Sequence, residues 1–212
     1  MPRVSRQQTE LNRVAITETA ARLYRERGLN GVSVAEVMNE AGLTHGGFYG
    51  HFESKEALAT EACAHAFEQS AIAWKEKIAS HRKKRKARKA IVDHYLASSK
   101  RDTAADTCPV VAFSGDMSHE DKQSALHQTY IKGLGVLMDA YLSTVEPGAS
   151  PQDETARRQA ALVEYSLMVG AMTLARATGK TALSDEILKS ARTFLNSDIS
   201  AVESLSEVKG VE

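Results

Sequence analysis

The chain has 212 residues, of which 42% are hydrophobic and 25% are charged, a composition typical of a globular protein with one or two domains. Basic and acidic side chains balance at 27 each, no apolar run is long enough to span a bilayer, and no secretion signal follows Met1. Two cysteines are too few for a disulfide framework, so we expect a cytoplasmic protein with reduced thiols.

Helical periodicity dominates the sequence and strand signals are almost absent, so the sequence predicts an all-α fold. Gly28 is a suitable C-cap for the first helix, and Ser33 with Glu36 has the spacing of a capping box that starts the second. Thr44 and Ser54 are placed to start the next two helices. The four predicted N-terminal helices cover residues 6–27, 34–42, 44–50 and 55–81.

The remainder predicts further helices separated by short breaks. Residues 107–109 interrupt the chain before a short apolar segment, the nearest strand candidate, and residues 147–151 form a loop rich in proline and glycine. Ser184 is expected to cap the last helix. These helices are predicted over residues 86–100, 120–145, 153–178 and 185–196.

Residues 33–52 carry the strongest functional signal. Two short helices joined by a turn that contains Gly42 form a helix-turn-helix arrangement, whose second helix enters the major groove of DNA. Gly46, Gly47 and Gly50 are poor helix formers that would let the backbone approach a ligand closely. Donor groups suited to phosphates come from Thr44, His45, Tyr49, His51 and Lys55. On the pattern alone, an ordinary helical hairpin is an equal alternative.

Residues 11–58 resemble the DNA-binding domain of the TetR family of repressors. The resemblance is carried by Tyr24 to Gly28, Gly31 to Val34, Ala41 to Thr44, Gly47 to Tyr49, His51-Phe52, Ser54 to Glu56 and Leu58. It implies phosphate contacts from Ser33, Thr44, Tyr49, His51 and Lys55, and base contacts from His45 and Gly46. Gly50 departs from the family, which usually has a larger residue there.

The resemblance also implies a domain organisation and a function. A three-helix helix-turn-helix domain is expected over residues 1–53, a helical ligand-binding and dimerisation domain over 54–200, and a frayed tail over 201–212. Such a protein binds palindromic double-stranded operator DNA as a homodimer, and a small-molecule inducer releases it. An activator or a nucleoid-coating protein is the alternative within DNA binding.

Small residues alternate with larger apolar ones between residues 153 and 178, a pattern that lets helices approach closely. Together with the last helix, this segment is expected to form a four-helix bundle between two copies. The predicted dimer interface consists of Leu162, Leu167, Gly170, Ala171, Leu174, Leu188 and Phe194.

Aromatic and methionine residues are scattered over the C-terminal helices, where such residues form core more often than pocket. Some should nevertheless line a ligand site. The predicted pocket residues are Phe67, Trp74, Cys108, Phe113, Tyr130, Tyr165 and Met168. Cys108 precedes Pro109 at a helix gap, where a thiol can stay accessible and reactive, and a small buried core residue is the alternative.

Several functional classes lack support in the sequence. The seven histidines show no metal-ligand spacing, and neither a nucleotide-binding loop nor a nucleophile elbow is present. We therefore expect no metal, no cofactor and no enzymatic activity, with an enzyme acting on the small molecule as the alternative that a turnover assay would test. The basic run Arg82–Lys89 is interpreted as a solvated loop and helix end, with nonspecific polyanion contact as its alternative.

Overall fold

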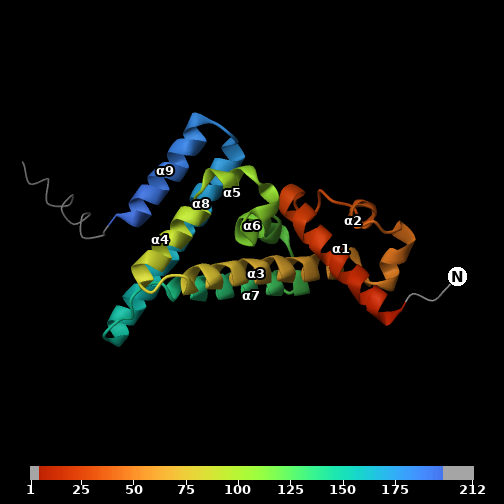
Figure 1. The fold of residues 1–212 in the computed structure, drawn as a ribbon, viewed down its shortest axis with the longest axis horizontal. Coiled ribbons are helices and arrows are strands. Elements are labelled where there is room, and N and C mark those ends of the chain that lie inside the picture. The colour runs from red at the N-terminus through yellow and green to blue at the C-terminus, as the bar shows by residue number, and fades with distance from the viewer. Residues whose placement is uncertain (1–4, 198–212) are drawn as a thin grey trace, which may run out of the picture. The chain divides into compact units, whose positions relative to one another are not determined.

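The computed structural model describes residues 5–197, and the elements in this range are helices and turns without strands (Figure 1). The all-α prediction is therefore confirmed, while the predicted tail at 201–212 lies outside the described residues. None of the described helices is both long and apolar enough to cross a membrane. Contacts divide the chain into two compact units, the first over 5–76 and 103–140, the second over 77–102 and 141–197.

The first unit contains the predicted helix-turn-helix. Its helices are α1 Arg6–Arg27, α2 Val34–Glu40, the 3₁₀ helix η1 His45–Gly50, α3 Lys55–Ala79, the short η2 Ala104–Asp106, α6 Pro109–His119 and α7 Ala125–Leu142. The last residues of α3 and α7, 77–79 and 141–142, belong to the second unit. The predicted capping box is present: Ser33 Oγ accepts from the Glu36 amide at 3.2 Å, and the Ser33 amide donates to the Glu36 carboxylate at 2.8 Å. These two bonds fix the start of α2.

The turn after α2 is a Schellman motif. Gly42 has a φ of +72°, which glycine adopts at no steric cost. The Leu43 amide donates to the Met38 carbonyl at 2.8 Å and the Gly42 amide to the Asn39 carbonyl at 3.0 Å. These bonds satisfy carbonyls at the end of α2 and turn the chain sharply into η1.

Two elements of the first unit differ from the prediction. The apolar segment after Cys108 is not a strand but the helix α6, because Pro109 occupies its first position, where a missing amide hydrogen costs nothing. The helix predicted from residue 120 begins only at Ala125. Asp121 accepts from the Gln123 amide and Ser124 from the His127 amide, so a side-chain-stabilised turn precedes α7.

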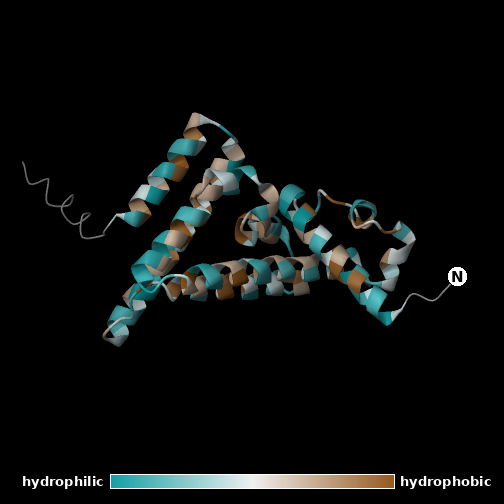
Figure 2. Cartoon of the chain, in the orientation of Figure 1, coloured by the Kyte–Doolittle hydropathy of each residue, from teal (hydrophilic) through white to brown (hydrophobic). Residues whose placement is uncertain are grey.

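The second unit contains α4 Lys84–Tyr95, α5 Ser98–Asp102, α8 Pro151–Thr178 and α9 Ala182–Asn196. The single helix predicted over 86–100 is broken after Tyr95, where the Leu96 carbonyl accepts from the Arg192 guanidinium of α9. Ser184 does not cap α9. Thr181 does so, and the buried Ser184 hydroxyl instead donates to the Ala175 carbonyl of α8 at 2.9 Å. Figure 2 shows hydrophobic and hydrophilic residues alternating along α9, as expected of an amphipathic helix.

A nearly buried ion pair crosses the second unit. The Arg88 guanidinium of α4 donates to both carboxylate oxygens of Glu164 on α8, at 2.9 and 2.5 Å. The fully buried Tyr141 hydroxyl donates to the same carboxylate at 2.7 Å. Burial and the adjacent Glu164 carboxylate raise the pKa of Tyr141. The raised pKa keeps the Tyr141 hydroxyl protonated, so it remains a hydrogen-bond donor to Glu164 between α4 and α8.

Candidate nucleic-acid interface

Two buried aromatic rings hold η1 against its unit. Phe48 and Phe52 are 1% and 3% exposed, and their rings stack with centroids 5.8 Å apart. Tyr49 points the other way with 76% of its surface exposed. Anchoring one side of η1 in the core leaves the opposite side free to meet a partner.

The outward side of η1 consists of His45, Gly46, Gly47, Tyr49 and Gly50, all exposed. The three glycines have ordinary negative φ values, so the backbone does not require them. A Cβ added at Gly46 or Gly50 would meet no atom within 4 Å. The fold therefore tolerates larger residues here, and the glycines keep this surface low enough for close approach by a partner.

Of the other predicted DNA contacts, Ser33, Thr44 and Lys55 lie at helix starts, and His51 follows the end of η1. Ser33 and Thr44 are exposed, and the Thr44 hydroxyl makes no capping bond to η1. Lys55 is the half-buried first residue of α3. His51 is half-buried, and its Nδ1 finds no hydrogen-bond partner among residues 5–197. Hydroxyls, an imidazole and an ammonium group beside helix N-termini form a donor set that suits phosphates.

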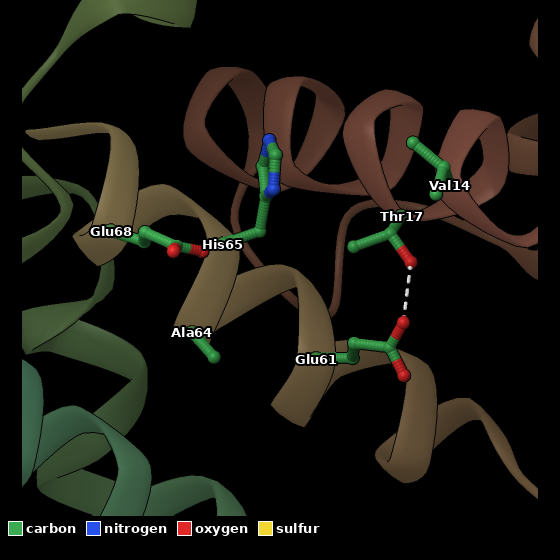
Figure 3. A pocket seen from close by; sticks show the side chains of 6 residues that line it. All are labelled: Val14, Thr17, Glu61, Ala64, His65 and Glu68. Carbon is green, nitrogen blue, oxygen red and sulfur yellow. Dashed lines mark hydrogen bonds between the residues drawn. The ribbon is translucent and has the colours of Figure 1, made fainter. Parts of the chain in front are cut away.

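Arg13 links this motif to α3, and sequence reasoning missed it. Its guanidinium donates to the His51 carbonyl and to the Glu61 carboxylate of α3, and it lies 4.3 Å from the centroid of the Phe52 ring. Glu61 also accepts from the Thr17 hydroxyl at 3.0 Å (Figure 3). The partners are 38 and 48 residues from Arg13 in sequence, so no local pattern could reveal the contact.

A small hollow adjoins the bond between Thr17 and Glu61, as Figure 3 shows. Its volume is about 230 Å³, and it is lined by Val14, Thr17, Glu61, Ala64, His65 and Glu68. Ligand pockets are usually larger than about 300 Å³. We therefore assign this hollow to the packing of α1 against α3.

A second link joins α6 to the turn between α1 and α2. The Asp116 carboxylate of α6 accepts from the Leu29 amide at 3.1 Å, and it lies 3.5 Å from the position of a Cβ added at Gly28. Near the other end of α6, burial lowers the pKa of Arg25, while the nearby Asp106 and Cys108 oppose that shift. A displacement of α6 would therefore alter its contact with the turn between α1 and α2 of the helix-turn-helix.

The predicted pocket residues fall into both units. In the first, Phe67 and Tyr130 pack edge to face at 5.6 Å, and Phe67 borders a groove of about 500 Å³ between α3 and α7. A Cβ at Gly133 would lie 2.2 Å from the Phe67 ring, so glycine is needed for this close packing. Trp74 and Phe113 are buried in the first unit, whereas Tyr165 and Met168 are buried on α8 in the second.

The two cysteines have different surroundings. Cys63 is 1% exposed inside α3, and burial raises its pKa to about 12. Cys108 is half-buried at the N-cap of α6. Of the two thiols, Cys108 is therefore the more accessible to a reagent.

Five of the seven predicted dimer residues line an apolar groove between α8 and α9. Its volume is about 630 Å³, and Leu167, Gly170, Ala171, Leu174 and Phe194 line it together with Ile187. Leu174 and Phe194 are 57% and 54% exposed, and Leu162 is 41% exposed. Leu188 is 2% exposed, so its side chain packs inside the protomer.

Comparison with known proteins identifies the N-terminal motif. Residues 16–62 match the family model described as bacterial regulatory proteins, tetR family. The chain is 42% identical over 48 residues to an uncharacterized HTH-type transcriptional regulator, YerO, of Bacillus subtilis. It is 39% identical over 49 residues to the HTH-type transcriptional repressor KstR2 of Rhodococcus jostii. These matches cover 23% of this chain in both cases, but only 17% and 24% of the relatives' own lengths.

Solved structures extend the likeness of fold beyond that motif. The reduced form of Escherichia coli NemR has a TM-score of 0.71 at 21% identity, covering 87% of this chain and 95% of that one. Bacillus subtilis FadR in complex with stearoyl-CoA has a TM-score of 0.63 at 13% identity, covering 87% and 97%. The second of these structures is described as a transcriptional regulator, as are the relatives matched in sequence. The N-terminal motif at residues 16–62 is therefore that of the tetR family of bacterial regulatory proteins, and the chain shares the fold of these solved structures.

Proposed function

We propose that this regulator is a repressor that binds a palindromic operator as a homodimer and is released by a small-molecule inducer. In this proposal residues 1–53 form the DNA-binding domain and residues 54–200 the regulatory and dimerisation domain. The observation that carries it is the outward side of η1, where a low glycine surface stands beside His45 and Tyr49. The name of KstR2 as a repressor supports the direction of regulation.

The groove between α8 and α9 supports the homodimer. Large apolar side chains are exposed on this face, and monomeric proteins seldom leave such patches uncovered. A second copy related by a two-fold axis would cover the groove with the same residues. Two η1 helices could then occupy successive major grooves about 34–36 Å apart.

Contacts inside the first unit support release by a ligand. The groove between α3 and α7 offers an apolar wall beside Phe67, and the bound stearoyl-CoA of FadR shows that this fold can hold a ligand with a long apolar part. A ligand that shifts α3 would move η1 through the contacts of Arg13 with His51 and Glu61. Such a ligand lowers the DNA affinity by a factor set by the ratio of its own affinities for the released and the DNA-binding conformations.

Selection from a random duplex library with the full chain tests the proposal. We expect a palindromic consensus with half-sites about one helical turn apart, and affinity that falls steeply with salt. Tyr49→Ala and Lys55→Ala should weaken binding to every sequence alike, whereas His45→Ala should relax discrimination at one position. Lys132→Ala, at an exposed lysine of α7, is the control that should bind as wild type.

The same experiment separates the alternatives. A short protected site in footprinting indicates a local regulator, whereas extended protection indicates a coating protein. The proposal is overturned if no sequence is enriched over random DNA.

A further inference from the structure

An unusually basic surface begins α4. Residues 81–89 contain seven lysines and arginines and no acidic residue. Within residues 5–197, no carboxylate forms an ion pair with Arg82, Lys83 or Lys86. The first turn of α4 lacks an acidic residue, and Lys83 makes no side-chain capping bond. Positive side chains thus adjoin the positive end of a helix, an arrangement that favours an anionic partner.

The end of α9 points toward this surface. The Arg192 guanidinium donates to the Leu96 carbonyl, and Asn196 donates to the Asp93 carboxylate at 2.8 Å. Contacts therefore move toward the start of α4 as α9 proceeds, so the two helices run antiparallel (Figure 1). The described part of α9 therefore ends beside α4 at Asp93, one turn after the basic residue Lys89.

Lys89 is the basic residue of α4 that shares a hydrogen-bond partner with the end of α9. Its ammonium group lies 2.6 Å from one Asp93 carboxylate oxygen, while the other oxygen of Asp93 accepts from Asn196. Lys86 lies three positions before Lys89, so helical spacing places the two on the same side of α4, and Arg82 and Lys83 directly precede the helix. A basic stripe therefore leads away from the last residue of α9 along α4.

The segment after α9 has the complementary charge. Residues 198–212 contain Asp198, Glu203, Glu207 and Glu212 against a single lysine. We propose that this segment docks on the basic stripe of its own chain, defined as Arg82, Lys83, Lys86 and Lys89. The occupied stripe no longer attracts other polyanions, which leaves DNA binding to the helix-turn-helix.

The lengths are compatible with this docking. The helical part of the stripe, from Lys89 back to Lys86, spans about 5 Å at 1.5 Å per residue, and Lys83 and Arg82 directly precede the helix. Fifteen extended residues reach about 50 Å, so residues 198–212 need not be stretched. The docking involves only the second unit and stands independently of the proposed operator binding.

Carbodiimide cross-linking of the full chain tests the docking directly. This reagent joins carboxylates to lysine amines in contact, and a mixture of unlabelled and ¹⁵N-labelled protein separates links within a chain from links between copies. We expect same-chain links from Glu203 or Glu207 to Lys83, Lys86 or Lys89. They should disappear in about 1 M salt, where the Debye length is about 3 Å. Links only between copies, or equal links to the exposed Lys75 and Lys132, would overturn the proposal.

Heparin, a soluble polyanion, provides a second readout. Glu203→Gln/Glu207→Gln should raise heparin affinity severalfold, because the stripe loses its occupant. The increase should vanish in a Lys83→Gln/Lys86→Gln background. Glu68→Gln/Glu186→Gln removes the same charge from two exposed helical positions and should have little effect. An equal increase in the lysine-deficient background would contradict docking on this surface.

Discussion

The recognition motif and the second unit rely on polar contacts of different range. Around α2, the bonds join residues close in sequence, such as Ser33 with Glu36, three positions apart. In the second unit, the Arg88 guanidinium reaches Glu164, 76 positions away, and Asn196 reaches Asp93 across 103 positions. The start of α2 is thus fixed locally, and Arg13 adds longer contacts to His51 and Glu61, whereas these pairs of the second unit join still more distant parts of the chain.

This difference separates binding from stability. Side chains on the outward side of η1 make few contacts within the chain, so their substitution should alter DNA affinity and leave the free energy of unfolding unchanged. The Arg88–Glu164 pair of the second unit is nearly buried, so its loss should lower that free energy. The apolar groove of α8 and α9 lies between these extremes, because a second copy would complete it.

The largest effect is expected at the dimer groove. Leu174→Glu places a carboxylate on a 57% exposed apolar position beside the groove. Burying that charge against a second copy is unfavourable, so sedimentation velocity should show monomers, and operator affinity should fall more than about 100-fold through lost avidity.

Leu183→Glu is a matched control, because Leu183 is also apolar and 56% exposed but does not line the groove. It should remain a dimer. A dimeric Leu174→Glu variant would show that the interface lies elsewhere.

The next effect concerns the ion pair of the second unit. Glu164→Gln leaves the Arg88 guanidinium, whose side chain is 18% exposed, without its counter-charge. Thermal and urea unfolding should show a loss of about 3 kcal/mol. Glu186→Gln, at an exposed position of α9, should stay within about 0.5 kcal/mol of wild type. An equally stable Glu164→Gln variant would contradict the importance of this pair.

The two thiols of the first unit differ in exposure, so their rates of alkylation should differ. A maleimide should alkylate Cys108 faster than Cys63, because the pKa of Cys63 is raised to about 12 by burial. If Cys108 takes part in sensing, Cys108→Ser should keep operator binding and lose release by electrophiles or peroxide. Wild-type release of the serine variant by every inducer would make Cys108 a core residue only.

The smallest effect is a pH dependence in the second unit. Burial, with Lys77 and Lys100 nearby, lowers the pKa of His94 from 6.5 to about 4. Between these values the unfolded chain binds more protons than the folded one, so stability should fall as the pH drops from about 6.5 to about 4. His94→Gln should flatten this part of the stability curve. An unchanged slope would assign it to other groups.

The local elements could be predicted because their signals are local. The capping box at Ser33, the positive-φ glycine at residue 42 and the end of α8 at Gly179 follow from neighbouring residues alone. Family resemblance added the expected contacts of the recognition motif. The charge run that begins α4 was visible as well, but its relation to α9 was not.

The features that the sequence did not predict depend on contacts between residues far apart in the chain. The break after Tyr95 depends on Arg192, which the sequence places 96 positions after Leu96. Thr181 caps α9 in place of the predicted Ser184, because the Ser184 hydroxyl donates to the Ala175 carbonyl of α8. Such pairings are set by tertiary packing, which propensity and spacing do not encode.

The central claim is that the glycine surface of η1 serves DNA and not the fold. The most direct test measures the operator affinity and the unfolding free energy of Gly46→Ala side by side, with Gly135→Ala as a control at another open helical glycine. Gly46→Ala should be as stable as wild type or up to about 1 kcal/mol more stable, because alanine favours helices. It should also bind the operator at least about tenfold more weakly, since each 1.4 kcal/mol lost is a factor of ten. Gly135→Ala should bind normally. Wild-type operator affinity in Gly46→Ala would contradict the claim.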